Sequence, residues 1–162
     1  LQQSGAVAET MARNGEINRK RIFTYNQGTF LGAAHELYKI TGDKQYLADA
    51  VKAAEYVMDH MSGNRGVLGN ATEGDGGLFH GIFFRYFVKL INDETLDTAT
   101  RRKFHAYLTH LATVMAEHGV NKNTMLYGGR WWKAPADHAP VGLTPHVTGC
   151  MLMEAMCVLK PL

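Results

Sequence analysis

Two short segments combine polar side chains with glycine directly before an apolar stretch. In the first of them, Tyr25, Asn26 and Gln27 precede Gly28. Their hydroxyl and amide groups both donate and accept hydrogen bonds, which is what the hydroxyl groups of a sugar require from a binding site. The same residues also suit the start of a helix, where Asn26 would cap free backbone N–H groups. The sequence leaves these two interpretations open.

The second segment spans residues 75–86 and again leads from polar and glycine residues into an apolar stretch. Asp75 lies between glycines, so it fits either a turn or a carboxylate that faces a pocket. His80 stands at the expected start of a helix, and we predict that it contacts a ligand rather than only caps the helix. Phe79 precedes it and completes the predicted mouth of the pocket.

Arg85 lies in the most apolar stretch of the chain. Arginine keeps its charge at any ordinary pH, so a buried guanidinium needs partners. We expect an ion pair with a carboxylate such as Glu36 or Glu154. The alternative is that Arg85 orients a carboxylate that contacts the substrate.

A third set of candidates lies in the loop before the last expected helix, where Trp131 and Trp132 are adjacent. Aromatic faces in loops stack on sugar rings, yet adjacent side chains point apart. We therefore expect one of them, Trp131, to contact the sugar and the other to pack beneath the loop.

The sequence shows no signal for a metal site or for a dinucleotide-binding site. The histidines are not spaced as metal ligands are, and the glycines of residues 74–77 follow no strand, so they form no dinucleotide fingerprint. We predict no metal and no cofactor. Cys150 and Cys157 are separated by about 10 Å of helical rise, too far for a disulfide within one helix, and we expect two buried thiols.

The composition is that of a globular domain. With 162 residues, of which 46% are hydrophobic and 20% charged, the chain fits one domain with a substantial core. A net charge of +2 is too small to indicate nucleic-acid binding, and no apolar run approaches the roughly 20 residues of a membrane span. The chain begins with Leu1 and shows no signal peptide, so we expect a mature or trimmed product.

The hydrophobic periodicity is helical nearly everywhere and predicts no strand. Apolar residues at three- and four-residue spacing predict five helices, at residues 28–40, 44–61, 79–92, 97–118 and 145–159. Gly42 and Asp43 mark the end of the first helix and the N-cap of the second. Thr144 and Pro145 have the residue types of an N-cap and a first helical position.

The helices alternate between inner and outer patterns. Helix 79–92 is apolar almost all round, which is typical of an inner helix, whereas helix 97–118 has a single apolar stripe. Long loops such as residues 62–77 precede the inner helices, and the turns from inner to outer helices are short. This order predicts an all-α toroid of helical hairpins whose long loops, and with them a binding site, lie at one end. A tetratricopeptide-like solenoid is the alternative, but the chain lacks the fixed repeat that such solenoids require.

The polar segments also resemble a known family. The run Tyr25-Asn26-Gln27-Gly28, with Gly32-Ala33 and Thr41-Gly42-Asp43 after it, is similar to a motif of family 76 glycoside hydrolases. These are the endo-α-1,6-mannanases and their fungal cell-wall relatives. Residues 79–86 resemble the Phe-Lys-Gly-Ile-Phe-x-Arg-Tyr segment of that family, with His80 in place of the lysine. The resemblance covers about residues 20–110 well and the remainder loosely.

The resemblance implies an (α/α)6 toroid and retaining hydrolysis of α-1,6-mannosidic bonds by two adjacent aspartates upstream of the Tyr25 motif. Such a mechanism places two carboxyl groups about 5–5.5 Å apart. This chain contains no two adjacent aspartates and only about half of the helical hairpins of a toroid. Residues 1–162 are therefore expected to be the C-terminal portion of one toroid domain, with no catalytic residue in this chain.

The expected ligand is mannan or a manno-oligosaccharide. The residues expected to bind it are those of the two polar segments and the loop: Tyr25, Asn26, Gln27, Asp75, Phe79, His80, Arg85 and Trp131. We expect the isolated chain to be inactive, and the face left by the missing half to be apolar and prone to self-association. A polymeric substrate suggests an extracytoplasmic setting. The alternatives are another six-hairpin sugar enzyme, such as an epimerase or an unsaturated glucuronidase, and a noncatalytic glycan-binding or scaffold module.

Overall fold

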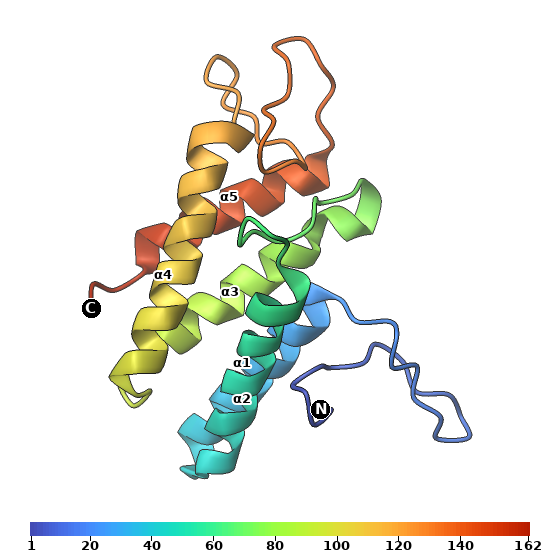
Figure 1. Ribbon diagram of the computed structural model, residues 1–162, viewed down its shortest axis with the longest axis vertical. Coiled ribbons are helices and arrows are strands. Elements are labelled where there is room, and N and C mark those ends of the chain that lie inside the picture. The colour runs from blue at the N-terminus through green and yellow to red at the C-terminus, as the bar shows by residue number, and fades with distance from the viewer.

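The computed structural model describes residues 1–162 and contains five α-helices and no strand (Figure 1). The helices are α1 (Thr24–Thr41), α2 (Lys44–Tyr56), α3 (Phe79–Ile91), α4 (Thr98–Val114) and α5 (Leu143–Val158). π-Helical turns at Val57–Met61 and Met115–Gly119 continue α2 and α4, and the 3-10 turn Gly74–Leu78 leads into α3. The prediction of an all-α chain with five helices is confirmed.

The boundary between α1 and α2 follows the predicted signals. Gly42 ends α1 in the left-handed conformation, with a φ of 72°, and its N–H donates to the Tyr38 carbonyl. The Asp43 carboxylate accepts a hydrogen bond from the Gln45 N–H at 2.9 Å, as an N-cap does. The start of α5 differs from the prediction, because the helix begins at Leu143 and has no side-chain cap.

The helices form two layers. The inner layer is α1, α3 and α5, in which α3 packs against both of the others, while α2 packs on α1 and α4 lies outside α3 and α5 (Figure 1). The inner helices run in one direction and the outer helices return. The long segments that precede the inner helices therefore meet at one end, as the sequence predicted. There the Ala71 N–H donates to the Gly129 carbonyl at 2.8 Å and joins two of these segments.

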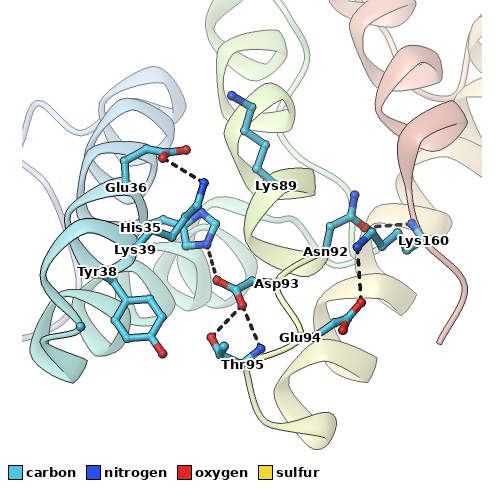
Figure 2. Close-up of a pocket in the computed structure, with 11 residues that line it drawn as sticks. His35, Glu36, Tyr38, Lys39, Lys89, Asn92, Asp93, Glu94, Thr95 and Lys160 are labelled. Atoms are coloured by element: carbon cyan, nitrogen blue, oxygen red, sulfur yellow. Dashed lines mark hydrogen bonds and ion pairs between the residues drawn. The ribbon is translucent and has the colours of Figure 1, made fainter.

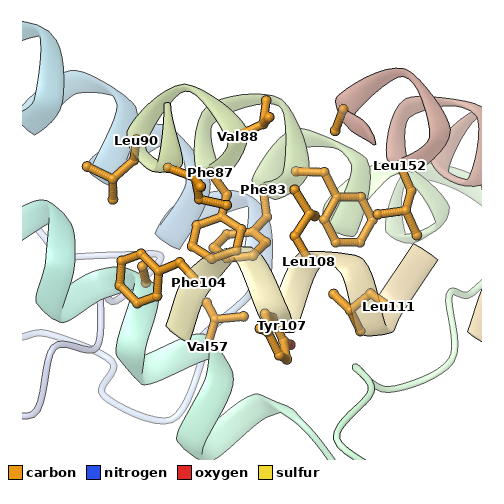
Figure 3. Close-up of a cluster of buried hydrophobic side chains, with 14 of the residues drawn as sticks. Val57, Phe83, Phe87, Val88, Leu90, Phe104, Tyr107, Leu108, Leu111 and Leu152 are labelled. Atoms are coloured by element: carbon orange, nitrogen blue, oxygen red, sulfur yellow. The ribbon is translucent and has the colours of Figure 1, made fainter. Parts of the chain in front are cut away.

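The core lies between the two layers and is centred on the aromatic face of α3 (Figure 3). The ring centroids of Phe83 and Phe87 are 4.9 Å apart, and Phe87 lies 5.1 Å from Phe104 of α4. All three side chains are fully buried. Full burial of one such side chain stabilises a protein by about 1.5–3 kcal/mol, so this cluster is a large share of what holds α4 on α3.

Three side chains expected in the interior are exposed. Cys150 and Cys157 are exposed free thiols, so the prediction of two buried thiols was wrong. Arg85 is exposed, and its guanidinium lies 5.9 Å from the Tyr86 ring without any ion pair to Glu36 or Glu154. All three lie at solvent-exposed positions of α3 and α5. A guanidinium in contact with water needs no carboxylate partner.

The exposed residues of the inner helices are of mixed character. Ile40, Leu143 and Val158 are largely exposed apolar side chains. Charged residues such as Glu36 and Lys89 are exposed on the same helices. The expectation of an apolar face is therefore met only at some positions. No helix is long and apolar enough to span a membrane.

The contact between α1 and α3 should tolerate no side chain at position 28. A Cβ atom on Gly28 would lie 2.6 Å from the Cα atom of Phe83, in backbone that has little room to move. We expect Gly28→Ala to lower the free energy of unfolding by about 1–3 kcal/mol in a urea titration. Ala33→Ser, at an exposed position of the same helix, should change it by less than about 0.5 kcal/mol. A Gly28→Ala protein as stable as the wild type would contradict this packing.

Candidate functional site

The candidate site lies at the end of the molecule where the long segments meet. The starts of α1 and α3 are joined there by His80, whose Nδ1 lies 2.9 Å from the Thr24 hydroxyl oxygen. The His80 Nε2 lies 2.8 Å from the Gly69 carbonyl oxygen, which also accepts a hydrogen bond from the Trp131 indole N–H at 3.2 Å. The Gly69 carbonyl thus joins α3 to two loops, and the other nitrogen of His80 extends this link to α1.

An aromatic cluster forms beside this junction. The Tyr25 and Phe79 rings have centroids 4.5 Å apart, and Phe23 lies 5.3 Å from Phe79 and 6.0 Å from Tyr25. All three side chains are partly exposed. Two residues that the sequence predicted from separate segments, Tyr25 and Phe79, are thus brought into contact at the surface.

The Tyr25 hydroxyl is held by a carboxylate that sequence reasoning missed. It donates a hydrogen bond to the Glu9 Oε1 atom at 3.0 Å, and the Glu9 Oε2 atom lies 2.7 Å from the Arg21 Nε atom. Burial, and next the hydrogen bond and the charge of Glu9, raise the pKa of the Tyr25 phenol. Tyr25 is therefore a protonated donor at neutral pH. No periodicity or motif pointed to Glu9, because it lies in an irregular segment.

Asn26 and Gln27 have different environments. The Asn26 Oδ1 atom, beside Tyr25, is shielded from water and has no hydrogen-bond partner in the protein, so it is a buried and unsatisfied acceptor. The Gln27 side-chain amide is wholly buried. It donates a hydrogen bond to the Val7 carbonyl at 3.1 Å and accepts one from the Val7 N–H at 3.3 Å. The predicted role of Gln27 in sugar binding does not fit this geometry. Its amide instead fixes the N-terminal segment to α1.

His80 is also committed to protein contacts. The Gly69 carbonyl can only accept, so Nε2 carries the proton, and Nδ1 then accepts from the Thr24 hydroxyl. Burial lowers the pKa of the His80 imidazole, and the hydrogen bond to Gly69 offsets part of this effect. The ring is therefore a neutral link between α1, α3 and a loop. The prediction that it contacts a ligand is not supported by this arrangement.

The two tryptophans have the opposite exposures to those predicted. Trp131 is 2% exposed and packs edge-on against Phe84, with ring centroids 6.4 Å apart. Trp132 is 40% exposed, with the Arg65 guanidinium 4.8 Å and the His118 ring 5.0 Å from its own ring. Trp131 thus packs beneath the loop because its indole N–H finds a carbonyl there, and it offers no free face to a sugar.

The last two predicted residues, Asp75 and Arg85, are both exposed. Asp75 is exposed in the 3-10 turn before α3 and takes part in no ion pair. Arg85 lines a separate groove of about 430 Å³ between α3 and α5, together with Met151 and Glu154. The carboxylate of Asp75 is thus at the loop end, while Arg85 is further along α3.

A wide hollow of about 890 Å³ lies at the opposite end, beside the C-terminal ends of α1 and α3 (Figure 2). Its charged groups pair with one another: His35 lies 2.7 Å from Asp93, and Lys39 lies 3.0 Å from Glu36. Lysines at helix C-termini offset the partial negative charge of free carbonyl groups. The charges of this hollow therefore have a structural explanation, and none of the predicted site residues lies in it.

The loop end offers chemistry for binding. It combines partly exposed aromatic rings with an exposed carboxylate and an unsatisfied amide oxygen. The half-buried carboxylate of Glu9 is already bound to Arg21 and Tyr25. No group of three or more His, Cys, Asp or Glu side chains is placed to hold a metal ion.

Comparison with known proteins identifies the family of the chain. The model of glycosyl hydrolase family 76 matches residues 2–161. The GH76A alpha-1,6-mannanase of Salegentibacter sp. HEL1_6 is 37% identical with a TM-score of 0.88, over 98% of this chain and 47% of that chain. An inactive variant of that mannanase, in which two adjacent aspartates are replaced by alanine, was solved in complex with alpha-1,6-mannotetrose. It is 38% identical with a TM-score of 0.89, over 99% of this chain and 48% of that chain.

A third structure extends the similarity to another organism. The Lin0763 protein of Listeria innocua is 28% identical with a TM-score of 0.83, over 97% of this chain and 44% of that chain. The comparison with curated proteins found no match. The chain therefore spans about half the length of the solved structures that it resembles.

The neutral state of His80 predicts a pH-dependent stability. In the unfolded chain the imidazole titrates near its ordinary pKa of about 6.5, so below neutral pH the unfolded state binds more protons. The free energy of unfolding should fall as the pH is lowered from 7 to 5, and it should fall less in His80→Gln. His138→Gln, at an exposed position, should behave as the wild type does. Urea titrations at both pH values test this, and an unchanged pH dependence in His80→Gln would contradict it.

The tryptophans should differ sharply in their contribution to stability. We expect Trp131→Ala to lower the free energy of unfolding by about 3–5 kcal/mol, because it empties a packed position and removes the hydrogen bond to Gly69. Trp132→Ala should cost less than about 1 kcal/mol, the size of an exposed cation–π contact. Denaturant titrations of the two variants give this comparison directly. Equal losses would show that the two environments are wrongly assigned.

Proposed function

The chain belongs to glycosyl hydrolase family 76, and on this basis we propose that it forms part of an enzyme that hydrolyses α-1,6-linked mannan. The observation that carries the proposal is the similarity over nearly the whole chain to a mannanase whose inactive variant was solved with alpha-1,6-mannotetrose. The family match favours this function over that of an epimerase or an unsaturated glucuronidase.

We infer that the chain is the C-terminal half of an α/α-toroid domain. It covers 47% of the mannanase chain, and its three inner and two outer helices leave one face of the inner layer open. A retaining mechanism requires two carboxyl groups about 5–5.5 Å apart, one to attack the anomeric carbon and one to protonate the leaving oxygen. No adjacent aspartates occur in this sequence, so we assign the catalytic pair to the other half. The inactivation of the mannanase by replacing two adjacent aspartates supports this assignment.

In this proposal the chain supplies one wall of the sugar site. The Tyr25 and Phe79 rings offer apolar surface to the C–H groups of a sugar ring. On binding, the Asn26 side chain turns to bring its shielded and unsatisfied Oδ1 atom to a sugar hydroxyl. Asp75, exposed at the same end, provides a second acceptor for hydroxyl groups.

The open face and the substrate have two further consequences. The exposed apolar side chains of the inner helices, such as Ile40 and Leu143, would contact the other half of the toroid and favour self-association when it is absent. Since mannan is a polymer, we place the whole enzyme outside the cytoplasm.

The isolated 162-residue chain should bind α-1,6-mannotetraose without cutting it. We expect the chain to release no reducing ends from α-1,6-mannan. Calorimetry should show binding of α-1,6-mannotetraose and no binding of maltotetraose, which serves as the control. Tyr25→Ala should weaken binding about tenfold, equivalent to about 1.4 kcal/mol. Tyr38→Ala, at the opposite end, should leave the affinity unchanged.

Two outcomes would contradict the proposal. Turnover by the isolated chain would show that the catalytic groups lie within it. Failure to bind mannotetraose would show that its loop end is not a sugar site.

A further experiment uses the longer protein that contains this chain. If replacing the adjacent aspartates of the other half abolishes mannan cleavage, the alternative of a noncatalytic glycan-binding module is excluded.

A further inference from the structure

Glu9 is a largely buried carboxylate that belongs to none of the recognised motifs. Its side chain is 18% exposed, although it lies in an irregular segment before α1. The backbone around it is fixed at two points. The buried Gln27 amide makes two hydrogen bonds to Val7, and the Glu9 N–H donates to the Arg21 carbonyl at 3.0 Å.

Each oxygen atom of the Glu9 carboxylate contacts a different neighbouring residue. Oε1 accepts the hydrogen bond from the Tyr25 hydroxyl at 3.0 Å, and Oε2 lies 2.7 Å from the Arg21 Nε atom. The Arg21 guanidinium in turn lies 5.8 Å from the centre of the Phe23 ring. The ion pair balances the charge of Glu9, so the cluster presents no net charge to a ligand and suits a neutral sugar.

The Tyr25 side chain is therefore held at two points, its ring and its hydroxyl group. The ring packs against Phe79, with centroids 4.5 Å apart and planes inclined by 49°, and the hydroxyl is bound to a charged acceptor. A hydrogen bond to a charged group is stronger than one between neutral groups, so it restricts rotation of the side chain more firmly. Asn26, the next residue along the chain, keeps its Oδ1 atom without a protein donor. A ring held in one orientation presents a defined apolar surface to a single sugar unit.

We propose that Glu9 is a positioning residue of the sugar site, which holds the Tyr25 ring in the orientation that receives one pyranose unit of the substrate. The inference rests on the proposed function. Its physical basis is pre-organisation, because a ring that is already oriented loses less freedom when the ligand binds. The competing possibility is that the Glu9–Tyr25 bond only anchors the N-terminal segment.

A double-mutant cycle separates these roles. Calorimetry with α-1,6-mannotetraose should show about threefold weaker binding for both Glu9→Gln and Tyr25→Phe in the full chain, about 0.7 kcal/mol each, which is less than the loss on removing the whole Tyr25 ring. The double variant should be no weaker than either single one, since each change removes the same hydrogen bond. Glu16→Gln, an exposed carboxylate of the same segment, should bind as the wild type does. If Glu9→Gln does not fold, Tyr25→Phe removes the bond from the other partner without losing the ring.

An independent readout follows the phenol itself. In an NMR titration, Glu9→Gln should lower the pKa of Tyr25 part of the way toward its ordinary value: burial, the largest cause of the raised pKa, remains, but the hydrogen bond and the charge of Glu9 are gone. Loss of stability with unchanged affinity in Glu9→Gln would show a purely anchoring role, and additive losses in the cycle would also overturn the proposal. Either result would leave the proposed function standing. Failure of the wild-type chain to bind mannotetraose would overturn both.

Discussion

The close approach of α1 to α3 is the contact on which the rest of the structure depends. Glycine at positions 28 and 32 lets α1 lie directly on the Phe83 backbone and on the Tyr86 ring, where any Cβ atom would overlap. The two helices run side by side in the same direction, so this one crossing sets their register along the whole length. It places Thr24 beside His80 at one end and His35 beside Asp93 at the other.

The position of the site follows from this register. Because α1 and α3 start at the same level, the residues that open each helix meet, and the long segments before them have to pack over the same end. The Gly69 carbonyl, which accepts from both His80 and Trp131, is the point at which these segments are joined. A rigid junction of this kind allows partly exposed rings beside it to keep a defined orientation.

The polar residues at this end differ in whether the protein already supplies their hydrogen-bond partners. This difference separates the structural residues from those that can bind a ligand. The polar groups of Gln27, His80 and Trp131 are used by backbone groups of distant segments, and removing any of them would strand a buried donor or acceptor. Asn26 has the reverse property, since its shielded oxygen has no donor in the protein. Residue type alone gives no distinction between these cases, because amides and aromatic rings suit both roles.

The sequence by itself determined the local elements, the cap at Asp43, the buried character of α3, the gathering of the loops at one end and the family. These features depend on periodicity and on residues close together in the chain. Only the tertiary structure decided which polar groups already have hydrogen-bond partners within the protein. It also decided that Arg85 and both cysteines are exposed, and that Glu9 binds the Tyr25 hydroxyl. The reason is physical: a hydrogen bond between an irregular segment and a helix start has no sequence period. A helical stripe shows which face is apolar, but not whether another part of the protein covers it.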